Sequence, residues 1–186
     1  MKKDEIRHRI RANKALLTNE DKAIAADKVF DQLEKLAAFI MSNRILMYHS
    51  LPDELSTIKF IKKWDKRKSF FLPRVNGLNL EILPFDQSKL SLGAFQIEEP
   101  QGDDTTDISS IEMIVVPAVA YDRNCNRVGR GKGYYDRLLA GSKALRVGIA
   151  YDFQVVDDIE TDEYDVPVDI LITESHTYIR KRSNRG

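Results

Sequence analysis

The stretch Ile111–Leu139, "IEMIVVPAVAYDRNCNRVGRGKGYYDRLL", joins the most apolar run of the chain to its most glycine-rich segment. The apolar run predicts a buried strand that ends at Pro117 or just beyond. The segment Arg127–Arg137, "RVGRGKGYYDR", is expected to form a loop, and a helix is expected to begin inside it at "YYDRLLAGS". A buried strand, a loop and a helix in this order are typical of α/β sheets.

The rest of the chain continues the alternation of helices and strands. Helices are expected at residues 3–17, 19–39 and 55–67, and strands at "RILMYHS", "SFFLPRV", "LNLEILPF", "ALRVGIAYD" and "VDILITES". The buried face of the second helix is expected to carry Ile24, Val29, Leu33 and Leu36. Phe60 is expected at the margin of the buried face of the third helix.

The expected fold class is α/β, in a single domain over residues 1–186, with a mostly parallel sheet flanked by helices in three α/β/α layers. A long polar connection is marked by Gly93, "EEPQGDD" and "TTDISS", and the basic tail "RKRSNRG" is expected to fray. In such sheets ligands bind beyond the carboxyl ends of the strands. Because the glycine loop follows the most buried strand, it is expected at that edge.

The composition of the chain limits which partners and which cellular compartment are expected. The 29 basic residues equal the 29 acidic ones, so no overall charge steers the chain to nucleic acid or to an anionic membrane. No apolar run approaches the ~18 residues that span a bilayer, and the N-terminus lacks the apolar core of a signal peptide. Cys125 is the one cysteine, which excludes an intramolecular disulfide and fits a passive loop thiol in a reducing compartment. We expect a cytoplasmic monomer with no nucleic-acid and no membrane partner.

The glycine loop has the composition of an anion site. Gly129, Gly131 and Gly133 alternate with Arg130 and Lys132. Glycines let several N–H groups turn inward around an anion, and the two cations add full charges. The alternative is a solvated turn before a helix that buries its tyrosines. The spacing matches neither the P-loop nor the dinucleotide-binding loop, so the loop alone leaves both interpretations open.

The residues around the loop carry a longer pattern. The stretch "PAVAYDRNCNRVGRGKGYYDRLL" resembles the signature of the 5-formyltetrahydrofolate cyclo-ligase family, also called methenyltetrahydrofolate synthetase. The segments "KKDEIR", "MYHSLPDELST", "RVGIAYDFQ" and "DEYDVPVDILIT" also stand in the family's order, so the resemblance covers almost the full chain. The polar spacer "NCN" is a difference that leaves the core of the motif untouched.

The resemblance implies an activity. Members of this family use ATP and Mg²⁺ to close 5-formyltetrahydrofolate to 5,10-methenyltetrahydrofolate, and they release ADP and phosphate. Phosphoryl transfer to the N5-formyl oxygen makes that oxygen a leaving group, and N10 then attacks the activated carbon. Such chemistry asks the protein mainly for positioning and for charge stabilisation.

The resemblance also assigns residues to an ATP site. Its positions are Lys3, Asp4, Glu5, Ile6 and Arg7, followed by Gly129, Arg130, Gly131, Lys132, Gly133, Tyr134, Tyr135, Asp136 and Arg137. Arg130 and Lys132 are the catalytic candidates, which would stabilise the transferring phosphoryl group. Lys3 and Arg7 lie four residues apart and so share one helix face, although an ordinary charged helix is the alternative for both.

The resemblance also implies residues that would contact the folate and residues that would bind magnesium. The folate-contacting positions are His49, Glu54 and Tyr151. Glu54 can accept hydrogen bonds from pterin N–H groups, whereas packed side chains are the alternative for His49 and Tyr151. The magnesium candidates are Asp136 and Asp165, and a surface turn acid is the alternative for Asp165.

Two other classes of function stay open. A non-catalytic folate-binding protein would keep the fold without turnover. An RNA-binding module would use the basic N-terminal helix and the basic tail, but the zero net charge and the lack of an aromatic RNA-reading motif disfavour it.

Overall fold

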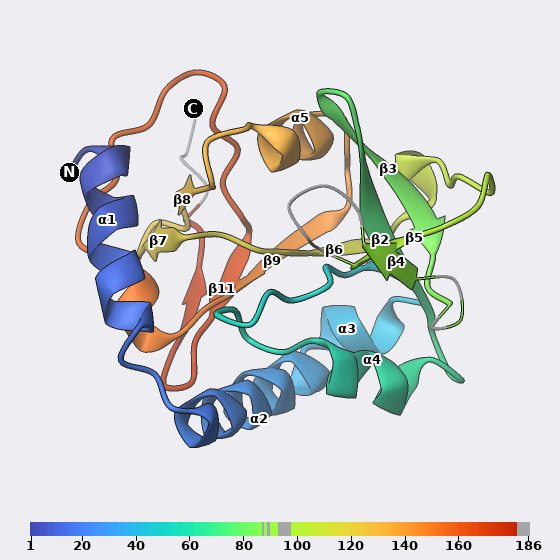
Figure 1. Ribbon diagram of the computed structural model, residues 1–186, viewed down its shortest axis with the longest axis horizontal. Coiled ribbons are helices and arrows are strands. Elements are labelled where there is room, and N and C mark those ends of the chain that lie inside the picture. Colours follow the sequence, from blue (N-terminus) through green and yellow to red (C-terminus); the bar gives the residue numbers. More distant parts are fainter. Residues whose placement is uncertain (87, 89, 93–97, 182–186) are drawn as a thin grey trace.

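The computed structural model describes residues 1–86, 88, 90–92 and 98–181, and a central sheet organises it (Figure 1). Within these residues the sheet has seven strands in the order β12-β11-β9-β6-β1-β2-β3. The strands are β1 (Arg44–Leu46), β2 (Ser69–Asn76), β3 (Asn79–Pro84), β6 (Met113–Val116), β9 (Leu145–Ile149), β11 (Ile170–Ile172) and β12 (Thr177–Ile179). Neighbours from β2 to β11 run parallel, and β3 and β12 are antiparallel edges. The predicted mostly parallel sheet is confirmed.

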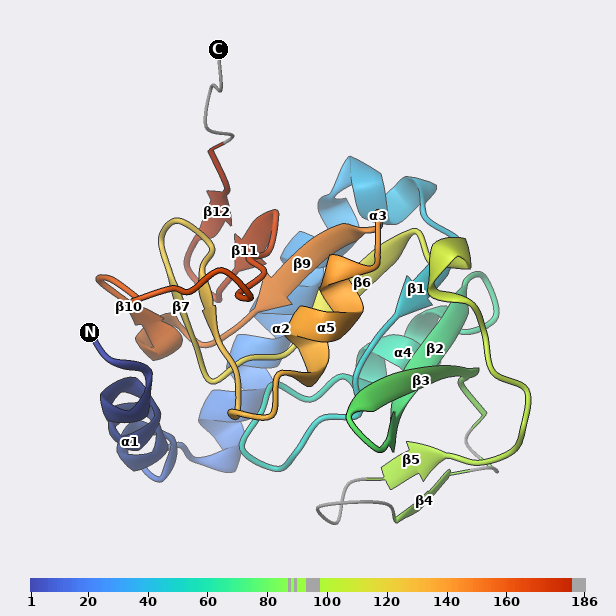
Figure 2. The same ribbon diagram turned by 90° about the horizontal axis from the view of Figure 1, so that it is seen from above.

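Helices cover both faces of this sheet. The helices over the sheet are α2 (Asn19–Lys35), α3 (Ala37–Met41), α4 (Ile58–Trp64) and α5 (Tyr134–Ala140), and α1 (Lys3–Lys14) lies to one side of it (Figure 2). Figure 1 shows α2, α3 and α4 on one face and α5 on the other, so the predicted α/β/α layering is confirmed. In the described part of the chain, no helix is long and apolar enough to cross a membrane.

Apolar side chains fill the space between the sheet and the helices on each face. Ile45 of β1 packs in the cluster that includes Val29 of α2, whereas the next residue, Leu46, packs in the cluster that includes Leu139 of α5. Successive strand residues point to opposite faces, and both faces are covered here. All four residues of β6 are therefore buried, as a continuous apolar run in a parallel sheet requires.

Some details of the helices differ from the sequence prediction. Leu36 has an extended backbone with ψ of 130°, so the second predicted helix is divided into α2 and α3. The placement of Ile24 on the buried face is wrong, because Ile24 is 48% exposed while Phe30 of the same helix is buried. The placement of Phe60 at a margin is also wrong. Phe60 is 3% exposed, and its ring stacks on Phe30 with centroids 4.7 Å apart.

A small second sheet supports the N-terminal helix. In the described residues its strands lie in the order β10 (Val155–Val156), β7 (Ala120–Asp122) and β8 (Arg127–Val128). Ile6 and Ile10 of α1 are buried in one apolar cluster with Val128 and Val156. Figure 2 shows α1 beside this sheet rather than over the central one. Arg127 and Val128, which the sequence places in a loop, are a strand because they pair with β7.

The predicted polar connection contains regular structure. β4 (Leu90–Leu92) pairs antiparallel with β5 (Glu98–Pro100), and a short 3-10 helix follows at Ile108–Ser110. Gly93, which marks the predicted connection, lies outside the described residues. Residues 182–186 of the predicted frayed tail also lie outside them.

Candidate active site

A cavity of about 1030 Å³ lies at the carboxyl edge of the parallel strands. Its walls are formed by α1, the turn after β1, the β2–β3 hairpin, the residues after β6, the glycine loop with α5, and residues 162–166. Segments after β1 and after β6 both reach it, because the carboxyl ends of parallel strands meet at one edge. This volume is at the upper end of the range for ligand pockets, which leaves room for two small molecules.

The glycine loop forms one side of the cavity. Gly131 and Gly133 have φ of +106° and +70°, a conformation that residues with a Cβ rarely adopt. Gly133 is also the N-cap residue of α5. The backbone therefore turns tightly on either side of Lys132, and Arg130 and Lys132 both line the cavity.

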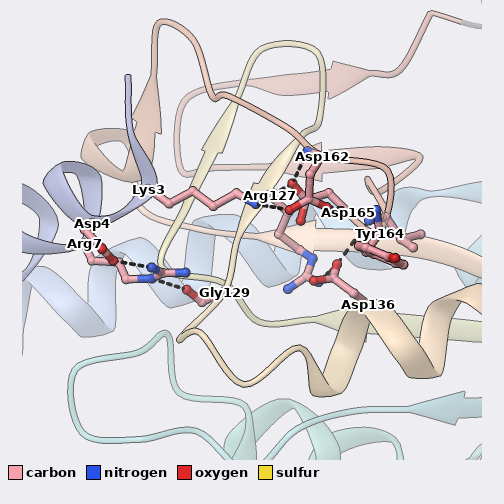
Figure 3. Close-up of polar contacts among 10 residues, drawn as sticks. Lys3, Asp4, Arg7, Arg127, Gly129, Asp136, Asp162, Tyr164 and Asp165 are labelled. Atoms are coloured by element: carbon pink, nitrogen blue, oxygen red, sulfur yellow. Dashed lines mark hydrogen bonds and ion pairs between the residues drawn. The ribbon is translucent and has the colours of Figure 1, made fainter.

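Two basic residues of α1 line the cavity, Arg7 next to the glycine loop and Lys3 next to residues 162–165. The Arg7 Nε donates a hydrogen bond of 2.8 Å to the carbonyl oxygen of Gly129 (Figure 3). The Lys3 Nζ lies 2.5 Å from a carboxylate oxygen of Asp165 and 3.5 Å from one of Asp162. Partial burial lowers the pKa of Lys3, but the two carboxylates outweigh this effect and leave the pKa raised. Helix α1 thus brings two positive charges to the cavity.

Asp136 and Asp165, the predicted magnesium ligands, both line the cavity. The Asp136 Oδ1 accepts hydrogen bonds from the Arg127 Nη2 at 2.6 Å and from the Val166 N–H at 3.1 Å, and Asp165 pairs with Lys3. Across the described residues, no group of three or more His, Cys, Asp or Glu side chains could hold a metal ion. Magnesium commonly uses one or two carboxylates when phosphate oxygens and waters complete its shell. The two acids supply that number of carboxylates at this cavity, where Asp136 is paired with Arg127 and Asp165 with Lys3.

A different part of the cavity is formed by the turn after β1 and by the β2–β3 hairpin. The side chain of Glu54 is 12% exposed and accepts a hydrogen bond of 2.9 Å from the N–H of Leu51. Burial raises the pKa of Glu54, and the Leu51 hydrogen bond opposes this shift. Pro73, Val75 and Leu80 add apolar surface. Apolar walls with one buried carboxylate suit a flat ring system that presents N–H donors.

The structure brings most of the predicted site residues to this one cavity. Those that line it are Lys3, Arg7, His49, Glu54, Gly129, Arg130, Gly131, Lys132, Gly133, Tyr134, Tyr135, Asp136, Arg137 and Asp165.

The other predicted site residues lie elsewhere. Ile6 is fully buried against the small sheet, and Tyr151 is 1% exposed within the main apolar cluster, so neither position supports contact with a ligand. Glu5 is exposed on α1 and does not line the cavity. Asp4 has a 94% exposed side chain that pairs with the Arg7 Nη1 at 2.6 Å, which orients a residue of the cavity without lining it.

Arg137 lines the cavity, but its guanidinium is bound to backbone oxygens. Its Nε donates to the carbonyl oxygen of Leu78 at 2.8 Å, and its Nη2 donates to the same oxygen and to the carbonyl oxygen of Lys132, the latter at 2.8 Å. Leu78 lies in the turn between β2 and β3. Arg137 thus ties the hairpin to the glycine loop, an arrangement that the sequence analysis did not predict.

Sequence reasoning also missed residues that line the cavity. One of them is Arg127, the first residue of the segment Arg127–Arg137, whose side chain is only 3% exposed. Asp162 and Tyr164 also line the cavity, and both precede Asp165 within the acidic segment "DEYD", whose density of acids was the available signal. Pro73 of the β2–β3 hairpin lines the cavity as well. A proline within a strand pattern indicates an edge or irregular position, and this was the sequence signal for it.

Cys125 takes no part in this site. It is fully buried, and burial raises the pKa of its thiol to about 11, which disfavours the reactive thiolate.

Fold and cavity together define a class of protein. It is an α/β protein in which a glycine-rich loop, several cationic side chains and a buried carboxylate line one cavity at the sheet edge. Such a site suits a polyphosphate held next to a flat polar ring.

Comparison with known proteins identifies the family. The sequence profile of the 5-formyltetrahydrofolate cyclo-ligase family matches residues 1–174, and the chain belongs to this family. The 5-formyltetrahydrofolate cyclo-ligase of Haemophilus influenzae is 30% identical over 182 residues, which cover 92% of this chain and 97% of that protein. The enzyme of the same name from Escherichia coli (strain K12) is 28% identical over 179 residues, which cover 91% of this chain and 98% of that protein.

Solved structures agree with this assignment. The NMR structure of Aquifex aeolicus 5,10-methenyltetrahydrofolate synthetase matches with a TM-score of 0.87 and 33% identity, over 99% of this chain and 96% of that one. A 5,10-methenyltetrahydrofolate synthetase from Mycoplasma pneumoniae matches with a TM-score of 0.77 and 25% identity, over 94% of this chain and 99% of that one.

Proposed function

We propose that this chain closes 5-formyltetrahydrofolate to 5,10-methenyltetrahydrofolate with ATP and Mg²⁺, and releases ADP and phosphate. One observation carries the proposal: the cavity joins the cationic glycine loop to the turn with buried Glu54 and to the apolar side chains of the β2–β3 hairpin. The names of the relatives and of the structural neighbours support the same reaction.

The cationic part of the cavity would hold the nucleotide. Lys3 and Arg7 line the cavity from α1, and Arg7 contacts the glycine loop. Arg130 and Lys132 belong to the loop itself. Their positive charges would offset the negative charges of a polyphosphate. The site is partly enclosed, and electrostatic interactions are strong in such a site. Arg130 also lies 4.0 Å from Glu54, so one cation reaches both parts of the cavity.

The other part of the cavity would hold the folate. Glu54 would accept hydrogen bonds from pterin N–H groups, and Pro73, Val75 and Leu80 would pack against the ring. His49 also lines this cavity, and its contact with the folate remains a prediction. Holding the ring here would place the formyl oxygen next to the glycine loop. Such positioning accounts for much of the catalysis in a two-substrate reaction.

The chemistry follows from the weakness of the formyl oxygen as a leaving group. ATP supplies the phosphoryl group that activates this oxygen, after which N10 attacks the formyl carbon and phosphate leaves. Arg130 and Lys132 would stabilise the charge on the moving phosphoryl group. Asp136 and Asp165 would hold Mg²⁺, which neutralises phosphate charge when it is bound.

The proposal is tested by an absorbance assay. Purified protein with ATP, Mg²⁺ and 5-formyltetrahydrofolate is expected to give a rising near-ultraviolet absorbance from the methenyl product. Lys132→Ala is expected to lower kcat by about 10²- to 10³-fold, as the loss of one transition-state donor does. Because Lys132 is exposed, the melting temperature of the variant is expected to equal that of the wild type.

Lys143→Ala is the matched control, since Lys143 is exposed and does not line the cavity. Tight folate binding by the folded wild type without any absorbance change would contradict the proposal and support a non-catalytic binding protein. Normal kcat in Lys132→Ala would remove this residue from the mechanism.

A further inference from the structure

An acid outside the cavity connects its two parts. The carboxylate of Asp53 has one oxygen 3.6 Å from the Arg130 Nη2 and the other 3.6 Å from the Lys14 Nζ. Arg130 belongs to the glycine loop, Lys14 is the last residue of α1, and Asp53 lies in the turn after β1. One carboxylate therefore links three elements that are far apart in the sequence.

Lys14 is unusual for a lysine in a charged helix. Its side chain is only 7% exposed, and the cost of burying an ammonium group lowers its pKa, although the charges of Asp53 and Glu54 oppose this. A buried charge of this kind is stable only with a partner. Asp53 is that partner, and its own side chain remains 46% exposed. Lys14 thus holds Asp53 from the protein side.

Arg130 is the second cation that Asp53 contacts. Its side chain is 53% exposed, and a long exposed arginine has several rotamers available. Asp53 at 3.6 Å and Glu54 at 4.0 Å both favour rotamers in which the guanidinium points to the folate turn. Neither distance is that of a tight hydrogen bond, so the contact biases Arg130 without removing it from the cavity.

We infer that Asp53 is a positioning residue that keeps Arg130 at the junction of the two parts of the cavity, and that Lys14 fixes Asp53 in this role. The inference rests on the proposed function, because the junction is where a phosphoryl group would pass to the formyl oxygen. Arg130 is the residue that would act on the transferring group. Asp53 acts through Arg130 and does not line the cavity.

This role predicts that loss of the Asp53 charge lowers turnover but does not weaken nucleotide binding. Removing the charge of Asp53 frees Arg130 to leave the junction, and misplacement of a catalytic group costs from about tenfold to about a hundredfold in rate. The same change removes a negative charge near the polyphosphate, so binding of the nucleotide is expected to stay the same or to become tighter. An acid that only stabilised the fold would weaken both together.

The experiment compares wild type, Asp53→Asn, Asp53→Glu and Lys14→Met. We expect Asp53→Asn to lower kcat by at least about tenfold, while the Kd for ADP with Mg²⁺, measured by calorimetry, is unchanged or lower. Asp53→Glu keeps the carboxylate and is expected to retain most of the turnover. Lys14→Met leaves Asp53 without its buried partner and is expected to lower kcat by a smaller factor than Asp53→Asn, whereas the loss of a positive charge is expected to leave the Kd for ADP unchanged or higher.

Asp27→Asn is the control, because Asp27 is an exposed acid of α2 that pairs with Lys59 at 3.3 Å. Unchanged kcat in Asp53→Asn would overturn the inference, as would a parallel loss of kcat, ADP binding and melting temperature. Failure of the proposed function would be distinct, since it would appear in the wild type as absent turnover.

Discussion

Glu54 is a residue at which stability and function conflict. Burial raises its pKa because a charged carboxylate loses its water there, although the N–H of Leu51 and the charge of Arg130 oppose the shift. The folded chain therefore binds a proton at Glu54 more tightly than the unfolded chain does. Free energy of unfolding is lost as the pH rises from the ordinary value of 4.5 through the folded-state pKa.

Glu54→Gln is expected to raise the melting temperature at neutral pH, because it removes a buried charge. The gain is expected to vanish at about pH 4, where the glutamate is protonated in both states. The variant is also expected to lose turnover, since an amide lacks the paired acceptors for the pterin edge. Thermal melts across this pH range and the absorbance assay measure the two effects.

Glu160→Gln is the matched control for this prediction, because Glu160 is exposed. The control is expected to change the melting temperature little at any pH. A Glu54→Gln protein that melts at a lower temperature than wild type at neutral pH would show that burial of the carboxylate is not the dominant effect.

The site residues that sequence predicts best are those whose local spacing already fixes their direction. Lys3 and Arg7 lie one helical turn apart, and both reach the cavity. Gly131 and Gly133 take the positive φ that glycine favours. Tyr151 is the opposite case: a tyrosine after a strand either packs or faces a ligand, and only the path of neighbouring segments decides which.

Among the elements, the glycine loop and α5 depend on one glycine. A Cβ at Gly133 would lie 2.8 Å from the Arg137 Nη1, and the φ of +70° is unfavourable for alanine. The arginine tip can move aside, but it would then release the carbonyl oxygens of Leu78 and Lys132. The glycine is therefore required for the link between the loop and the β2–β3 hairpin.

Gly133→Ala is expected to lower the free energy of unfolding by about 1–2 kcal/mol, the cost of a left-handed backbone for a residue with a Cβ. It is also expected to weaken the binding of ADP with Mg²⁺, because the loop loses its shape. Denaturant unfolding and calorimetry measure the two quantities. The control is Gly141→Ala, where φ is −91° and the nearest atom would lie 3.8 Å from the new Cβ. Equal ADP affinity in Gly133→Ala and wild type would contradict the prediction.

Sequence predicts six of the seven described strands of the central sheet, because each of the six is rich in apolar residues, but it misses the edge strand β12 (Thr177–Ile179). It misses β10 and β8, because two residues carry no periodicity. The break between α2 and α3 is missed for another reason. Leu36 is a good helix former, so its own preference gives no sign of the extended backbone that it adopts between the two helices.

At the scale of the whole molecule, the cavity joins regions from both ends of the chain. Lys3 in α1 binds Asp165, and both line the space assigned to the nucleotide. A ligand that binds only the folded chain stabilises it by about 2.7 kcal/mol at a hundred times its Kd. That free energy would be shared by every segment that contacts the ligand.

We therefore expect ADP with Mg²⁺ to raise the melting temperature and to slow hydrogen exchange in α1 and in residues 162–166 together. Exchange measured by mass spectrometry with and without the nucleotide tests this. Lys3→Met is expected to reduce the protection in both segments. Protection confined to the glycine loop would show that the ends of the chain do not contribute to nucleotide binding.

The global fold was predictable because alternating helices and apolar strands admit few arrangements, and one parallel sheet covered on both faces is among them. The detailed shape of the cavity was not predictable in the same way. It depends on α1 docking onto the small sheet, through side chains such as Ile6 and Ile10 whose partners lie more than a hundred residues away.

The contact between Lys3 and Asp165 spans 162 positions of the chain, and it has a consequence for biosynthesis. The ribosome releases the first helix early and its acidic partner late. A nascent chain that stops before residue 162 already carries the glycine loop and Glu54, but it lacks the carboxylates that hold Lys3 in place. Only a chain translated beyond residue 166 therefore contains every segment that lines the cavity.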